Sequence, residues 1–193
     1  MDMVGHQYDP LIGIWVKSKP SHIQTFIRNW EDTHEAQAFL VYDLPPMLPQ
    51  GGLIFLHAIK ENKLSAYAKY VGCEYIKGWS SDYNLREQER NRIWRTYGND
   101  KKRLHTHKEE EFKKFWEDQK GVRGLFLMEE VCEVPKKVSW DEEKRILKIY
   151  RPIGFSYKYL TATQVREFLE LIGINMEIEV KGIESPIVRW HFK

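Results

Sequence analysis

Short runs of apolar residues, separated by polar and turn-forming ones, predict several buried strands along the chain. Residues 11–17 (LIGIWVK) illustrate the pattern, because apolar side chains continue on both faces of the expected strand. Asn62-Lys63 suits a hairpin turn. Pro135 is expected to end the strand before it, because proline lacks a backbone N–H. The predicted strands are residues 11–17, 38–42, 53–58, 64–76, 124–134, 145–150 and 155–159.

Capping boxes mark the expected starts of three helices. In this motif a Ser or Thr side chain and a Gln or Glu three residues later bond each other's backbone. The pairs are Ser21 with Gln24, Thr106 with Glu109, and Thr161 with Gln164. The helices they begin are expected to end near Trp30, Asp118 and Leu171. A fourth helix, residues 85–97, is highly charged and is followed by Gly98 as a C-terminal stop.

The order of these elements predicts an α+β fold around a mixed, mostly antiparallel and barrel-like sheet. We expect one domain over residues 1–173, with a helical insertion at about residues 84–118. Residues 174–193 alternate like an edge strand and are expected to form a C-terminal strand or tail. The chain has no glycine-rich dinucleotide or phosphate-loop motif, which excludes Rossmann and P-loop nucleotide-binding folds.

Composition narrows the class of protein further. The 193 residues include no apolar run of about 20 and no signal-peptide pattern, so a soluble, cytoplasmic protein is expected. Cys73 and Cys132 are expected to stay reduced. The net charge is +2, so a nucleic-acid partner would have to be recognised by local charge or by a pocket. Seven Trp and ten Tyr exceed what one core needs, which favours an aromatic binding surface.

The order of short motifs resembles that of PUA-like domains, with the YTH branch the most similar. Residues 14–18 match its opening strand, which ends in Lys-Ser, and Trp30 matches the Trp after its first helix. The other matching segments are residues 52–58, 67–72, 116–121 and 125–134 for the YTH branch, and Arg151-Pro152 and residues 155–157 for the related ASCH and EVE groups. These short matches are scattered over residues 11–173.

This resemblance implies a PUA-like β-barrel, flanked by helices, that binds DNA or RNA. In the YTH and EVE groups an aromatic cage holds one modified base. By position, Lys17 and Ser18 would border that pocket, while Trp30 and Trp116 would form its walls. Such domains often serve as targeting modules of a larger restriction or RNA-processing assembly. No cofactor, metal or catalysis of its own is expected for such a module.

The chemistry of base binding adds a further candidate segment. A flipped base has two flat faces and a polar edge, so it needs aromatic walls and a few fixed donors and acceptors. Trp79 lies between Gly and Ser in an expected loop, with Ser80 and Asp82 beside it, which favours a binding role. Trp30 fits a helical core stripe better than a cage, and Trp116 fits either place equally well.

A basic stretch in the middle of the chain is the best candidate for phosphate contacts. Its members are Arg86, Arg90, Lys101, Lys102 and Arg103. The alternative is a solvated helix on which arginines pair with Glu87 and Glu89, and the helical part of the stretch favours that interpretation.

The sequence also contains patterns typical of two other functions, a nuclease and a metal-binding protein. The Glu177, Glu179 and Lys181 segment has the acid-x-Lys form of metal-dependent nucleases, although that pattern is common by chance. His105 and His107 could suggest a metal site, but no third ligand is indicated. A protein-interaction module with an aromatic surface is the third class.

Overall fold

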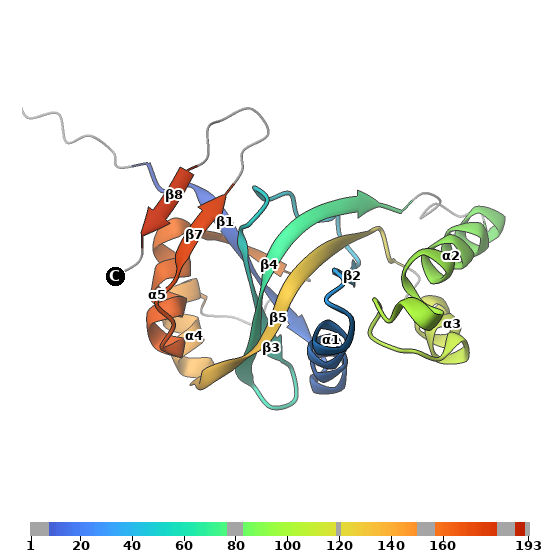
Figure 1. The fold of residues 1–193 in the computed structure, drawn as a ribbon, viewed down its shortest axis with the longest axis horizontal. Coiled ribbons are helices and arrows are strands. Elements are labelled where there is room, and N and C mark those ends of the chain that lie inside the picture. Colours follow the sequence, from blue (N-terminus) through green and yellow to red (C-terminus); the bar gives the residue numbers. More distant parts are fainter. Residues whose placement is uncertain (1–7, 77–82, 119–120, 150–156, 181–187, 192–193) are drawn as a thin grey trace, which may run out of the picture.

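Six strands form one strongly curved sheet at the centre of the molecule (Figure 1). A computed structural model describes residues 8–76, 83–118, 121–149, 157–180 and 188–191. Within these residues the strand order is β2-β5-β4-β3-β1-β6. β1 runs parallel to β3, and the other neighbours in this sheet are antiparallel. The strands are β1 (Leu11–Ser18), β2 (Gln37–Val41), β3 (Leu53–Ala58), β4 (Lys63–Tyr75), β5 (Gly124–Ser139) and β6 (Tyr157–Thr161).

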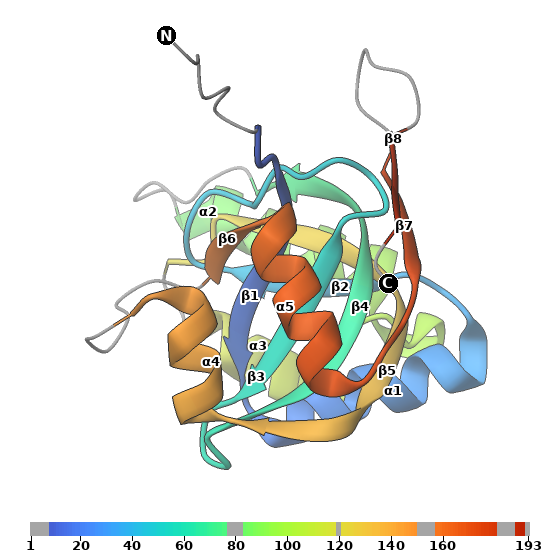
Figure 2. The same cartoon turned by 90° about the vertical axis from the view of Figure 1, so that its left-hand side faces the viewer.

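Helices cover both faces of this sheet. α1 (Pro20–Thr33) packs on one face, where Ile23 and Phe26 join a core cluster with strand residues. α4 (Trp140–Leu147) and α5 (Ala162–Ile172) lie side by side on the opposite face, as Figure 2 shows. There Phe168 stacks on Phe55 with 4.9 Å between ring centroids. The alternation of apolar side chains along the strands thus supplies two separate cores.

A helical lobe projects from one end of the sheet, away from α4 and α5 (Figure 1). It consists of α2 (Tyr83–Tyr97), the short 3₁₀ helix η1 (Asn99–Lys101) and α3 (Glu109–Asp118), and we call it the α2–α3 lobe. A third core cluster joins it to the sheet, with Ile93 and Phe112 packed among residues of β2 and β5. The lobe lies in the region, residues 84–118, where the sequence predicts a helical insertion.

β7 (Glu177–Val180) and β8 (Val188–His191) form a hairpin after α5. Ile178 and Val180 point into the core beneath α4 and α5, while Glu177 and Glu179 face outward. β7 passes very close to the turn before β3. A β-carbon added to Gly51 would lie 2.2 Å from the carbonyl oxygen of Glu179, and Gly51 has a φ of +92°.

Gly51→Ala is therefore expected to lower the free energy of unfolding by about 2 kcal/mol, because a left-handed conformation and a backbone clash act together. Gly72→Ala is the matched control, since an added β-carbon there meets no atom within 4 Å. Urea unfolding of both variants measures the difference. Equal stability of the two variants would contradict the close approach of β7.

The structure confirms the α+β fold and the mixed, mostly antiparallel sheet. The predicted helix 161–171 is also confirmed. Thr161 and Gln164 make both bonds of the capping box, and Gly173 ends the helix with a φ of 77°. Among the described residues, every helix is too short or too polar to cross a lipid bilayer.

Two strand predictions were wrong. The described part of the predicted strand 145–150, residues 145–149, is not a strand, because α4 extends to Leu147 and Lys148 caps it. Ser139 and Glu142 form a capping box that the strand interpretation overlooked, and Ile146 and Leu147 pack into the core from the helix. Pro135 does not end β5, which continues to Ser139. The β4–β5 register shifts between Leu64 and Ala66, so Pro135 stands outside the paired positions and its missing N–H costs nothing.

Two helix starts also differ from the predictions. α1 begins at Pro20 after Lys19, and no side chain caps it, so the Ser21–Gln24 box is not formed. α3 begins at Glu109 instead of following Thr106 directly. The Thr106 hydroxyl accepts from the backbone N–H of Lys108 and donates to the Glu111 carboxylate, which closes a turn before the helix.

Candidate functional site

One face of α2 carries four side chains that line a cleft. Tyr83, Arg86, Glu87 and Arg90 are spaced i, i+3, i+4 and i+7, so they lie on the same side of the helix. Trp116 and Glu117, near the end of α3, complete the lining. These six residues define the α2–α3 cleft, which has a volume of about 250 Å³. This volume is just below the roughly 300–1,000 Å³ of drug-sized ligand sites, so it suits a single flat ring system.

Contacts further along α2, toward its C-terminal end, fix the helix in place. Trp94 stacks on Phe112 of α3 with 5.4 Å between ring centroids. The Tyr97 hydroxyl donates to the Glu74 carboxylate of β4 at 2.8 Å. Burial and this bond raise the pKa of Tyr97 to about 12, so the phenol remains a donor. The cleft is therefore built on two helices that are anchored to each other and to the sheet.

The walls of the cleft are aromatic and largely apolar. Trp116 is only 4% exposed and packs against Phe112 at 6.0 Å between ring centroids, so it belongs to the core and lines the cleft as well. Tyr83 is 70% exposed. The cleft thus combines a rigid indole with an accessible phenol ring.

Two buried N–H groups of the cleft residues lack a hydrogen-bond acceptor among the residues that the structure describes. Arg90 is 8% exposed, and its Nη2 donates to Glu87 at 3.2 Å and to Asn91 at 3.3 Å, while Nη1 lies 3.9 Å from Glu117. Its Nε and the indole Nε1 of Trp116 have no acceptor. An unpaired buried donor costs about 1–3 kcal/mol. Native structures rarely leave such groups unpaired, so two of them at one cleft need an explanation.

The structure brings together three of the predicted site residues: Trp116, Arg86 and Arg90. Lys17 and Ser18 end β1, just before α1 begins. Trp30 lies in the last turns of α1, roughly 16 Å further along its axis, so these residues do not share a pocket. Trp30 packs on the core cluster under α1 and beside His34, whereas Trp116 belongs to the cluster of the α2–α3 lobe. Trp79, Ser80 and Asp82 lie outside the described residues.

The remaining basic residues lie at the opposite end of α2 from the cleft. Lys101 Nζ donates to the carbonyl of Arg95 at 2.9 Å. Lys102 Nζ is 3.6 Å from the Asp32 carboxylate. Arg103 Nε donates to the carbonyl of Ala36 at 2.6 Å, and its guanidinium lies over Tyr97. These three residues join the end of α2 to α1 and β2. Within α2 the pairs Arg90–Glu87 and Arg92–Glu89 match the ion pairing of the alternative interpretation, but Arg90 is buried instead of solvated.

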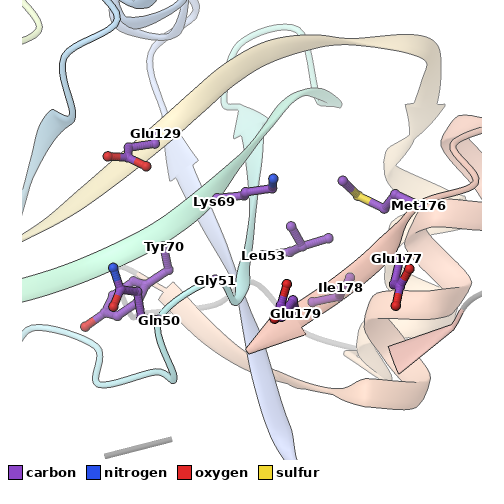
Figure 3. Close-up of a pocket in the computed structure, with 10 residues that line it drawn as sticks. All are labelled: Gln50, Gly51, Leu53, Lys69, Tyr70, Glu129, Met176, Glu177, Ile178 and Glu179. Carbon is purple, nitrogen blue, oxygen red and sulfur yellow. The ribbon is translucent and has the colours of Figure 1, made fainter. Parts of the chain in front are cut away.

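A second cavity of about 300 Å³ lies between β7 and the sheet, and the segment proposed for a nuclease borders it. Figure 3 shows Glu129 on β5 at one side and Glu177 and Glu179 on β7 at the other. Lys69 Nζ forms a salt bridge with Glu130 Oε2 at 2.8 Å. Lys181 lies outside the described residues. In the part of the chain that the structure describes, no three His, Cys, Asp or Glu side chains are grouped to hold a metal ion.

The histidines of the 105–107 segment contact α1. The ring of His105 lies 4.3 Å from that of His22, and His107 Nε2 is 2.6 Å from Asn29 Oδ1. Burial lowers the pKa of His22 to about 4 and that of His105 to about 3, so both rings are neutral near pH 7. They contribute to packing between α1 and the α2–α3 lobe.

Three cleft residues were not assigned to the site from sequence: Tyr83, Glu87 and Glu117. The signal that could have found the first two is the helical spacing from Tyr83 to Arg90. Glu117 is brought to the cleft by the packing of α3 against α2, which local sequence does not specify.

The fold is similar to that of an ASCH domain whose structure is known. The crystal structure of an ASCH protein from Zymomonas mobilis is similar, with a TM-score of 0.58 and 12% sequence identity over 83% of this chain and 95% of that one. Two point mutants of the same protein give TM-scores of 0.59 and 0.58 at 12% and 13% identity, and cover 85% and 83% of this chain and 99% and 98% of theirs. The sequence matches no protein-family model, and a search of curated proteins finds no match.

Proposed function

We propose that this protein binds single-stranded or locally unpaired nucleic acid, DNA or RNA, and holds one base in the α2–α3 cleft. The observation that carries the proposal is a cleft of single-ring-system size whose lining combines aromatic walls with arginines. The resemblance to YTH and EVE domains implies the same kind of ligand, a methylated or unmethylated base. The ASCH-like fold is compatible with such a role.

Each part of the cleft has a task in this proposal. Trp116 and Tyr83 provide the flat surfaces, and stacking on an aromatic ring contributes about 1–3 kcal/mol per base. Arg86 is half-buried at the cleft and forms no ion pair with the residues that the structure describes, so it is assigned to the phosphate next to the bound base. Such a contact weakens as salt rises, because phosphate neutralisation releases counterions.

Tyr83→Ala tests the proposal with little risk to folding, since the ring is exposed. We expect the Kd for a short single-stranded oligonucleotide to rise about 5- to 150-fold, the loss of one stacking contact. Fluorescence anisotropy with labelled DNA and RNA oligonucleotides measures it. Tyr75→Ala, which removes an exposed tyrosine of β4, is the matched control and should bind like the parent. Equal binding by Tyr83→Ala and the parent would refute the proposal.

We also propose that the chain acts as a binding module without catalysis, which would target a larger restriction or RNA-processing assembly. The nuclease alternative predicts divalent-dependent cleavage that is lost in Glu179→Ala. Incubation of the labelled oligonucleotides with Mg²⁺ separates these two ideas. Cleavage by the parent that Glu179→Ala abolishes would establish the nuclease instead.

A further inference from the structure

A second, larger groove adjoins the α2–α3 cleft on the same pair of helices. Its lining includes Gln88, Asn91, Trp94 and Arg95 of α2 and Glu109 and Lys113 of α3, and we call it the Arg95 groove. Glu87 and Arg90 line both the cleft and the groove, so the two cavities meet at these residues. The groove has a volume of about 870 Å³, against about 250 Å³ for the cleft, so it has room for more than a single base.

The two cavities follow one another along the helices. The cleft lies between the first residues of α2 and the last residues of α3, whereas the groove lies between later residues of α2 and the first residues of α3. The helices, which Figure 1 shows side by side, are therefore antiparallel at this surface. Tyr83 and Arg95 stand at the two ends of α2's contribution, about 18 Å apart along the helix axis. Stacked nucleotides of one strand are roughly 3.4 Å apart, so this length matches about five nucleotides.

The charges of the groove leave one arginine open to a ligand. The carboxylates of the groove are each paired with a cation of the groove, Glu87 with Arg90 at 3.2 Å, Glu89 with Arg92 at 2.9 Å and Glu109 with Lys113 at 3.3 Å. Arg95 is exposed and forms no ion pair with the residues that the structure describes. Lys101 Nζ donates to the carbonyl oxygen of Arg95 at 2.9 Å, so a second cation lies close by. This end of the groove is therefore positively charged, which favours a phosphate.

Two amide side chains continue the row toward the cleft. Gln88, Asn91 and Arg95 are all exposed and are spaced i, i+3 and i+7, so they lie on one face of α2. Asn91 Oδ1 accepts from Arg90 Nη2 at 3.3 Å, which leaves the amide N–H groups of Asn91 for a ligand. Amides both donate and accept hydrogen bonds, so they can serve the phosphates and the base edges of a strand. Trp94 also lines the groove and is held in place by its stacking on Phe112.

We infer that a nucleic-acid strand with one base in the α2–α3 cleft continues along the Arg95 groove, so that the whole site holds about five nucleotides and places a phosphate at Arg95. This inference rests on the proposed function, because the strand starts from the base in the cleft. It adds the length of the ligand and its course along α2. The buried N–H groups of Arg90 and Trp116 take no part in it, because they have almost no accessible surface.

Oligothymidylates of two, four, six and ten nucleotides test the course of the strand. Each one competes with a labelled ten-nucleotide strand in fluorescence anisotropy. We expect the affinity to rise about 10-fold or more from two to six nucleotides, because the longer strand adds phosphate and amide contacts in the groove. From six to ten nucleotides we expect less than about a 2-fold change, since the site is already filled at about five.

Arg95→Ala removes the proposed phosphate contact. We expect it to weaken binding of the six-nucleotide strand about 10-fold and to leave the two-nucleotide strand unchanged. The slope of log K against log salt for the six-nucleotide strand should become about 0.7 less steep, the value for one phosphate of a single strand. Arg166→Ala, at an exposed arginine of α5, is the matched control and should bind like the parent at both lengths.

Gln88→Ala separates contact in the groove from a general effect of charge, because it leaves the net charge unchanged. We expect several-fold weaker binding of the six-nucleotide strand alone. Alanine favours the helix and both Gln88 and Arg95 are exposed, so the two variants should fold like the parent, which thermal unfolding checks.

The outcomes separate this inference from the proposed function. Equal affinity at two and six nucleotides, with weaker binding by Tyr83→Ala at both lengths, would overturn the course along the groove and keep base binding. Binding that Tyr83→Ala leaves unchanged at every length would overturn the proposed function. A rise with length that neither Arg95→Ala nor Gln88→Ala reduces would place the rest of the strand on another surface and overturn the inference.

Discussion

Glu143→Ala is expected to lower the free energy of unfolding by about 3–5 kcal/mol, the typical cost of removing one partner from a buried pair. Glu143 lies on α4 and is fully buried, and His57 of β3 is 3% exposed. His57 Nδ1 is 2.8 Å from Glu143 Oε2, and the Trp15 indole donates to Oε1 at 2.9 Å. Without the carboxylate, two buried polar groups of the sheet lose their acceptor.

The same contacts tie α4 to the two parallel strands at the centre of the fold. Trp15 is on β1, and the rings of Trp15 and Trp140 lie 5.1 Å and 5.2 Å from His57. Glu143→Gln is expected to lose less stability than Glu143→Ala, because its carbonyl oxygen still serves one donor. Glu167→Ala, an exposed glutamate of α5, should change stability by no more than about 0.5 kcal/mol. Urea unfolding measures all three. A loss in Glu143→Ala no greater than in Glu167→Ala would contradict the role of this network.

Lowering the pH from 7 to 4 is expected to reduce the free energy of unfolding, because His22 and His105 take up protons on unfolding. The expected reduction is on the order of 3 kcal/mol, a value that is discounted for the partial exposure of His22. Burial holds their pKa values at about 4 and about 3 in the folded protein, against about 6.5 for a solvated His. Between pH 6.5 and pH 4 the unfolded chain therefore binds protons that the folded protein does not. Stability is complete above pH 6.5 and falls as the pH decreases.

His105→Leu isolates this contribution, since leucine is neutral at every pH and suits the neighbouring Phe112 and Phe115. The stability of this variant should depend less on pH between 6.5 and 4 than that of the parent. His34→Gln, at an exposed His beside Trp30, should keep the parent's dependence. Urea unfolding at several pH values gives the slopes. An identical slope in His105→Leu and the parent would show that His105 does not contribute to the acid sensitivity.

Local signals predicted much of the fold because the relevant contacts are short-range. The capping box at Thr161 involves residues three apart, and β3 matched its apolar run of residues 53–58. The failure at residues 145–150 was also local, since the Ser139–Glu142 box was available in the sequence. The failure at Pro135 was not local, because the β4–β5 register shift that tolerates it depends on how two distant strands pair.

The candidate site likewise has a part that local sequence predicted and a part that depends on tertiary packing. Arg86 and Arg90 could be placed on one helix face from their spacing alone, and the chemistry of Trp116 was recognisable in the sequence. Trp116 lies next to α2 because α3 packs against α2. Trp30 lies away from Trp116 because α1 packs on another part of the sheet. Contacts between residues so far apart in the chain leave no periodic pattern in the sequence, so the sequence could not predict them.

By itself, the sequence determined the helices and strands whose signals are periodic or capped, the α+β class, and the abundance of aromatic and basic side chains. The tertiary structure alone decided which of those side chains meet. Docking of α3 against α2 brings Trp116 to Tyr83 and Arg90 at one cleft. The physical reason is that hydrophobic burial is non-directional, so the apolar pattern selects which residues are inside without specifying their partners.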